Sequence, residues 1–157
     1  MDNKTIIIKK KPNVRKNIKL DDRLFQIPAD LLINKLYLGI ECEGNKAAKS
    51  CIMKKLSCYQ MQDKKKKKFD PDKFITYEQL IETLVASKIK CRYCRQCLKI
   101  FYQQTREPLQ WTLDRIDNTK GHNQNNVVIA CLKCNLERRT RNDKKFLFSK
   151  QMKIIKK

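Results

Sequence analysis

Two Cys-x-x-Cys pairs, Cys91 with Cys94 and Cys131 with Cys134, constrain this chain more than any other feature of its sequence. Each pair can turn two thiolates toward one ion, and two such pairs complete the closed tetrahedral site that structural zinc (Zn²⁺) prefers. Residues 95–130, between the pairs, form a longer loop than that of a common zinc ribbon. We therefore expect a functional insert held at its base by metal, with four unrelated buried thiols as the alternative.

The other cysteines have weaker patterns. Cys97 makes a second Cys-x-x-Cys with Cys94, and we favour Cys91 as the partner because Cys97 can then begin the following segment. Three cysteines lack any paired spacing: Cys42, Cys51 and Cys58. Two of these lie on the apolar face of a predicted helix, where cysteine packs as a small hydrophobic residue. We expect all three in the core, with a second metal site as the alternative.

The charge of the chain indicates a polyanionic partner. The sequence has 37 Lys and Arg against 16 Asp and Glu, a net charge of +21. Each phosphate that Lys or Arg neutralises releases condensed counterions, so an excess of this kind favours nucleic acid, DNA before RNA. An anionic membrane surface is the main competitor. No apolar run approaches the roughly 20 residues that a membrane-spanning helix needs.

Composition and periodicity divide the chain into four stretches and predict an α+β fold. The stretches are a basic extended arm over 1–23, a helical lysine-rich accessory region over 24–70, a zinc-held domain over 71–145 and a basic tail over 146–157. Apolar residues recur at helical spacing over 27–39, 45–60 and 74–88. Thr76 and Gln79 have the spacing of a capping box. Residues 110–115 and 127–130 predict two strands, and a helix should begin in the segment from Cys131.

The zinc-held domain contains two oxygen ligands for a second ion. Asp114 ends the first predicted strand, and Asn135 directly follows Cys134. Mg²⁺ prefers one or two protein oxygens and keeps several waters. Because zinc would fix Cys134, it would also fix Asn135 relative to the strand of Asp114. Hydrolysis of a phosphodiester needs such an ion on the phosphate, so the pair predicts catalytic Mg²⁺ or Mn²⁺.

These motifs resemble a known family. C-x-Y-C at 91–94 and TLDRIDN-x-x-GHN-x-x-NVVIAC-x-x-CN-x-x-RR at 112–139 are similar to the HNH endonucleases, ββα-metal enzymes, in the subgroup with a zinc-binding cysteine frame. The segments ITYEQLIETLVASKIKCRYC at 75–94 and REPLQWTLDRIDN at 106–118 resemble HNH proteins of large DNA viruses of eukaryotes in particular. The resemblance implies an antiparallel hairpin over a helix, DNA in the groove above, Asp114 and Asn135 as metal ligands, and Asn126 as a brace for the loop between the strands.

The chain departs from that family at the general base. Most HNH enzymes have histidine after the strand-end aspartate, whereas this chain has Arg115, which cannot accept a proton but can grip a phosphate. His122, the only histidine, is either a base or phosphate contact or an exposed turn residue. Asp117 either supports the metal or begins a turn. Three arginines after Asn135 should contact phosphates: Arg138, Arg139 and Arg141.

Two functions remain open. The first is an HNH-type DNA endonuclease, with Zn²⁺ for structure and Mg²⁺ or Mn²⁺ for hydrolysis. The second is a non-cleaving nucleic-acid-binding or structural protein of a ribosome-like particle or virion, which the missing histidine and the basic ends favour. A homodimer or larger nucleoprotein assembly fits either. Unpaired thiols favour a reducing compartment, such as host cytoplasm, nucleus or a virion, with an organelle as an alternative.

Overall fold

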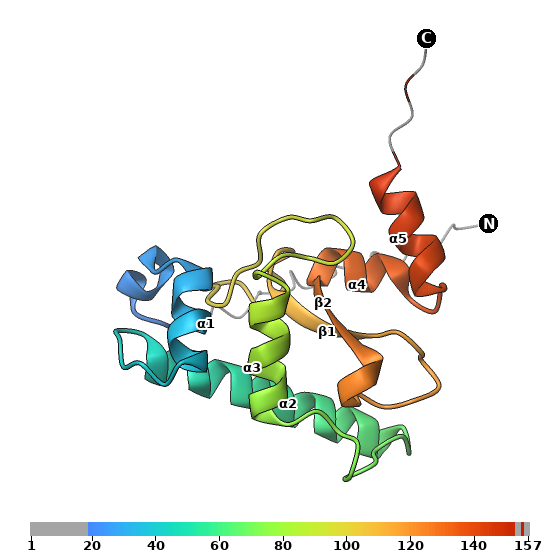
Figure 1. Cartoon of the computed structure of the whole chain (residues 1–157), viewed down its shortest axis with the longest axis horizontal. Coiled ribbons are helices and arrows are strands. Elements are labelled where there is room, and N and C mark those ends of the chain that lie inside the picture. The colour runs from blue at the N-terminus through green and yellow to red at the C-terminus, as the bar shows by residue number, and fades with distance from the viewer. Residues whose placement is uncertain (1–18, 153–154, 156–157) are drawn as a thin grey trace, which may run out of the picture.

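The computed structural model describes residues 19–152 and 155. Helices and one two-stranded antiparallel sheet make up this part of the chain, which confirms the α+β class (Figure 1). The elements are α1 (Ala29–Tyr37), α2 (Asn45–Lys65), α3 (Tyr77–Ala86), β1 (Trp111–Arg115), β2 (Val127–Cys131), α4 (Leu132–Arg138) and α5 (Asp143–Gln151), with 3-10 turns at Asp22–Gln26 and Gln124–Asn126. Most of the predicted basic arm, residues 1–18, lies outside the described residues.

The three predicted helices of the first half all form. Gly39 follows α1, and its φ of 69° allows Ile40 N–H to bond Lys35 O at 2.9 Å in a Schellman cap. α3 begins with the predicted capping box: Thr76 Oγ1 accepts from Gln79 N, and Gln79 Oε1 accepts from Thr76 N. α2 runs past its predicted end at residue 60, because the following residues are good helix formers and end in lysines that suit a helix C-terminus.

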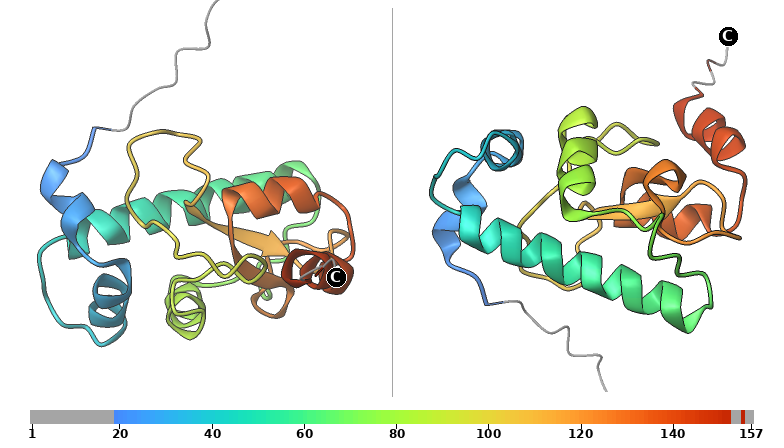
Figure 2. Two further views of the ribbon diagram at one scale, coloured as in Figure 1. Left: turned by 90° about the horizontal axis from the view of Figure 1, so that it is seen from above. Right: turned by 60° about the horizontal axis from the view of Figure 1, so that its bottom comes forward.

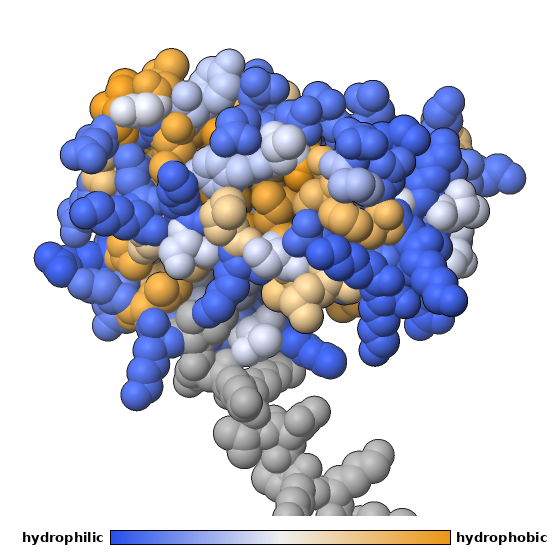
Figure 3. Space-filling model, turned by 90° about the horizontal axis from the view of Figure 1, so that it is seen from below, coloured by the Kyte–Doolittle hydropathy of each residue, from blue (hydrophilic) through white to orange (hydrophobic). Residues whose placement is uncertain are grey.

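One core joins the accessory region to the zinc-held domain. Residues buried together in it come from every part of the described chain, among them Leu32, Ile52, Leu80, Trp111, Leu113, Ile129 and Phe146. α2 extends along one side of the molecule from α1 to the loop between the strands (Figures 1 and 2). The predicted boundary between residues 70 and 71 therefore separates no independent cores. Hydrophilic side chains predominate on the α2 side, with apolar patches among them (Figure 3).

Helices pack against the hairpin along its open edge and against its strands. β1 and β2 pair with Trp111 opposite Cys131 and Asp114 opposite Val128. α2 lies beside the backbone of β1, where Tyr59 Oη accepts from Leu113 N at 3.0 Å. α4 contacts both strands and reaches Asp114. With α2 along the open edge and α4 against the strands, Trp111 through Asp114 are all buried, instead of alternating between core and solvent.

The start of the predicted basic tail is helical. Residues 143–151 form α5, capped by Asn142, whose side-chain oxygen accepts from Lys145 N at 3.2 Å. Phe146 is buried, and its ring meets that of Tyr93 edge-on at 4.9 Å between centroids. Phe146 is the one apolar residue of this segment that is fully buried, and a single such position shows no helical period in the sequence. The predicted boundary between residues 145 and 146 therefore falls inside a helix. Within the described residues, no helix is both long and apolar enough to cross a membrane.

Candidate functional site

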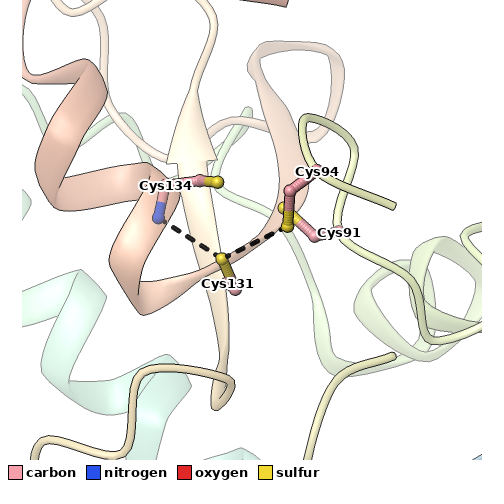
Figure 4. Close-up of side chains that lie close together, drawn as sticks. All are labelled: Cys91, Cys94, Cys131 and Cys134. Carbon is pink, nitrogen blue, oxygen red and sulfur yellow. Dashed lines mark hydrogen bonds between the residues drawn. The ribbon is translucent and has the colours of Figure 1, made fainter. Parts of the chain in front are cut away.

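Four cysteines converge at the junction of β2, α4 and the loop after α3. The sulfur atoms of Cys91, Cys94, Cys131 and Cys134 all lie within 4.8 Å of one another (Figure 4). This cluster confirms that the two predicted pairs come together and that Cys91 is the partner of Cys94. Cys97 is exposed and outside the cluster. The prediction of core packing is wrong for Cys58, which is exposed, while Cys42 and Cys51 are half-buried against the core.

The four thiols shift one another's pKa values, and a bound cation would favour the deprotonated form of all four. The contact between Cys131 and Cys91 lowers the pKa of Cys91 to about 4 and raises the pKa of Cys131, while burial raises the pKa of Cys134 to about 12. A crowded group of this kind carries little negative charge unless a metal ion compensates it. Four sulfurs at this spacing fit tetrahedral Zn²⁺, whose bonds to sulfur are about 2.3 Å. The cluster could therefore hold a structural metal such as zinc.

Backbone hydrogen bonds shape the first cysteine pair. Arg95 N–H bonds Cys91 O at 3.0 Å, and the left-handed φ of 61° at Arg95 closes the turn. Arg92 N–H bonds Ile129 O at 2.9 Å and so ties the turn to β2. On the other side, Cys131 caps α4, because its sulfur accepts from Cys134 N at 3.3 Å.

Asp114 lies in a buried ion pair that the sequence did not predict. Arg138 donates from Nε to Oδ2 at 2.6 Å and from Nη2 to Oδ1 at 2.8 Å, and Tyr93 Oη donates to Oδ2 at 2.6 Å. Arg138 is fully buried, so the prediction that it contacts phosphates is wrong. Burial, then the Asp114 carboxylate, raises the pKa of Tyr93, which keeps this phenol a neutral donor. The ion pair joins the end of β1 to α4.

The donor set at Asp114 leaves room for one more bond. A carboxylate offers about four lone-pair sites, and these three donors use both on Oδ2 and one on Oδ1. Asn135, one turn before Arg138, donates its Nδ2 to Thr112 Oγ1 at 3.1 Å and to Leu113 O at 3.3 Å, which leaves its Oδ1 as an acceptor. A carboxylate and an amide oxygen are ligand types that a hydrated Mg²⁺ prefers, but Arg138 already neutralises the carboxylate.

His122 is not an exposed turn residue, and that interpretation is wrong. Its side chain is buried, with Nδ1 2.8 Å from Asp63 Oδ1, and its backbone N–H donates to Asp63 Oδ2 at 2.6 Å. Its ring packs on that of Tyr59 with centroids 4.5 Å apart. Gly121 must be glycine here, because a Cβ would lie 2.5 Å from Lys68 O. Asp63 was missed because it belongs to the lysine-rich helix and pairs across 59 residues.

Burial lowers the pKa of His122 below its usual 6.5, against the opposing effect of Asp63 and with help from Arg115 and Lys66. The unfolded chain therefore takes up a proton first as the pH falls, so we expect the free energy of unfolding to decline below about pH 6.5. Urea unfolding at several pH values should show this decline, and His122→Asn, which can still donate to Asp63, should reduce it.

The comparison with His122→Asn is needed because a second group, Lys55, changes its charge in an adjoining pH range. Burial lowers the pKa of Lys55 to about 7, which adds a decline of the same sign as the pH falls toward 7. That part should persist in the variant. Identical pH dependence of the two proteins below pH 6.5 would contradict the assignment to His122.

The loop between the strands is braced as the resemblance implies. Asn126 Oδ1 accepts from Asp117 N at 2.9 Å, and its Nδ2 donates to Asp117 O and Gly121 O, each at 2.9 Å. Asp117 begins the turn, with Oδ1 accepting from Thr119 N at 2.9 Å. Asp117 was predicted either to support the metal or to begin a turn, and its contacts with Thr119 are those of a turn.

A basic groove lies beside this loop. Its volume is about 860 Å³, and its cationic lining is Lys66, Lys68, Arg115, Arg139 and Arg141. Arg115 Nη1 donates to Lys120 O at 3.2 Å, and Asn118 Nδ2 donates to Arg139 O at 3.2 Å, so the groove walls are joined across the loop. Three of the residues predicted to contact phosphates, Arg115, Arg139 and Arg141, thus line the same groove. Lys66 and Lys68 belong to the predicted lysine-rich accessory region, and their place in a lysine run directly after a helix could have indicated this role.

Comparison with protein-family models, curated proteins and solved structures finds no match to this chain.

Proposed function

We propose that this chain is an HNH-type endonuclease that hydrolyses phosphodiester bonds of DNA with Mg²⁺ or Mn²⁺. The observation that carries the proposal is the placement of Asp114 and Asn135 between β1 and α4, with a four-cysteine cluster at one end and the basic groove beside the loop. A carboxylate and an amide oxygen held by a rigid frame are suitable ligands for a hydrated hard ion.

Each residue has a role in this proposal. Tyr93 and Arg138 hold the Asp114 carboxylate, and the cysteine frame holds Asn135. A divalent ion at these oxygens would stabilise the charge that develops on the phosphate. Arg115, at the groove, would grip the same strand.

His122 is the candidate base in this proposal. Asp63 engages its Nδ1, so only Nε2 can accept a proton, and the lowered pKa keeps the imidazole neutral near pH 7.

Supercoiled plasmid incubated with the protein and Mg²⁺ or Mn²⁺ should become nicked. Asn135→Ala removes one ligand oxygen and should reduce the rate by about 100-fold or more, since the ion would lose part of its site. Asn34→Ala, on the exposed side of α1, serves as a matched control and should cut at the parent rate. Cutting by Asn135→Ala at the parent rate, or an uncut plasmid with every divalent ion, would contradict the proposal.

The groove should bind phosphates without reading sequence. Arg139→Gln or Lys66→Gln removes one exposed groove cation, so affinity should fall similarly for all DNA sequences. The slope of log affinity against log salt should become shallower by about 1 for each phosphate that the protein no longer neutralises. Fluorescence anisotropy over a salt series measures both, with Lys54→Gln on α2 as the matched control. An unchanged slope in both groove variants would place the nucleic acid elsewhere.

A second candidate function is binding without cleavage. The observation that favours it is the ion pair itself, since the Arg138 guanidinium occupies the position of a compensating cation at Asp114. A protein of a nucleoprotein particle could use such a pair purely for stability. DNA or RNA that is bound tightly and stays intact with Mg²⁺ and Mn²⁺ would favour this function.

A further inference from the structure

A second groove lies along the 121–126 segment and has a different chemistry. Its volume is about 580 Å³, within the range of about 300–1,000 Å³ that is usual for small-molecule sites. It is lined by the carboxamides Gln79, Asn123, Gln124, Asn125 and Asn126, with Phe74 on its wall, and we call it the carboxamide groove. Lys68 lines both grooves, so the two adjoin.

The carboxamides differ in how many of their polar atoms already have hydrogen-bond partners. Asn126 is committed to the loop through both its oxygen and its nitrogen, and Gln79 Oε1 caps α3. Asn123 Oδ1, in contrast, is buried and has no hydrogen-bond partner among the described residues. A buried acceptor without a donor is unfavourable, so a ligand donor that the amide turns to meet would be favourable. Gln124 and Asn125 are exposed beside it.

The charges of the carboxamide groove are nearly balanced, with Lys68, Lys73 and Lys120 against two aspartates, so this groove attracts phosphates less than the basic groove does. The aspartates are Asp70 and Asp72, and Lys73 is held by Asp70 with Nζ 2.9 Å from Oδ2. The basic groove has five cations against two aspartates, so a phosphate is attracted more strongly there than in the carboxamide groove. Phe74 is half-buried beside Phe69, with ring centroids 5.4 Å apart, and offers an apolar surface to a flat ring. The lining therefore suits a neutral heteroaromatic group with donors and acceptors at its edge.

We propose that the carboxamide groove binds a nucleobase of a strand whose phosphates lie in the basic groove. The base is an adenine by preference, because Asn and Gln side chains match the donor and acceptor pair at its N6 and N7. The inference rests on the proposed function only in that it takes a nucleic acid as the ligand of the basic groove. It adds a contact to bases, and so a sequence preference, that phosphate contacts alone do not supply.

The test measures binding of the full chain to short fluorescent single strands at low salt. The probes are dA, dC and dT homopolymers and an abasic deoxyribose-phosphate strand of the same length. We expect dA to bind about tenfold more tightly than the abasic strand. Asn123→Ala and, separately, Asn125→Ala should remove most of this difference, whereas affinity for the abasic strand should stay at the parent value. Gln62→Ala, an exposed carboxamide of α2 outside the groove, should retain it.

The outcomes separate the inference from the proposed function. Equal binding of dA and abasic strands, preference for dC or dT, or an unchanged difference in both variants overturns the adenine site and leaves phosphate binding intact. Failure of the parent to bind any strand overturns both. A difference between dA and abasic strands that persists as salt is raised, while the affinity for both strands falls, supports the inference because only the phosphate contacts are strongly salt-dependent. Asn125 is exposed, so its variant keeps the test valid if Asn123→Ala folds poorly.

Discussion

Removal of a metal ion held by the four-cysteine cluster is expected to destabilise the fold markedly. The cluster joins the loop after α3 to β2 and α4, and no disulfide joins these segments. Structural zinc contributes about 10–16 kcal/mol in small zinc-dependent peptides. Because the core here includes other helices, we expect a smaller loss, of about 5 kcal/mol, and a fall in Tm of roughly 10–20 °C. Thermal unfolding with and without a strong chelator measures this.

Two cysteine variants provide the matched comparison. Cys131→Ser removes a ligand and should lower both the Tm and the zinc content, which metal analysis should find near one ion per chain in the parent. Cys97→Ser, an exposed cysteine outside the cluster, should change neither. A parent protein that holds no zinc, or one that keeps its Tm after complete chelation, would show that the cysteines pack without a metal.

Asp114→Ala is expected to destabilise the fold as well as stop cleavage. The change leaves the fully buried Arg138 without its carboxylate, and breaking a buried ion pair in this way costs about 3–5 kcal/mol. Tyr93 also loses its acceptor. Urea unfolding should show the reduced stability directly. A stability equal to that of the parent would mean that Arg138 finds another partner or reaches solvent.

Loss of cleavage in Asp114→Ala alone would therefore be ambiguous. A triple variant, Asp114→Leu with Arg138→Met and Tyr93→Phe, replaces the buried polar groups by apolar side chains of similar size. Such replacements are often neutral or stabilising, so it should regain most of the stability that Asp114→Ala lacks. It would still have no carboxylate at this position, which separates the catalytic role of Asp114 from its structural one.

The cysteine frame and the main elements could be predicted because their signals are local. The two Cys-x-x-Cys spacings and the Thr76 and Gln79 box each act within a few residues, and each is in its predicted place. α5 could not be predicted in this way. Its anchor is Phe146, and only the distant Tyr93 ring explains why that residue is buried.

The candidate site shows the same division between local and distant signals. His122 depends on Asp63, far away in the chain, and no local pattern indicated that contact. Arg138 is different, because it follows Asn135 by three positions and so shares its helix face, which a helical projection would have turned toward β1. The run LERRTR concealed this, since it consists mostly of residues typical of a solvated surface.

The measurement that tests the central claim most directly is plasmid nicking by the triple variant, with DNA affinity measured on the same samples. If Asp114 holds a catalytic ion, the folded variant should bind DNA about as tightly as the parent, through the intact basic groove, and nick at less than about one hundredth of its rate. Nicking at the parent rate by a folded variant without this carboxylate would contradict the account, since the active site would have to lie elsewhere.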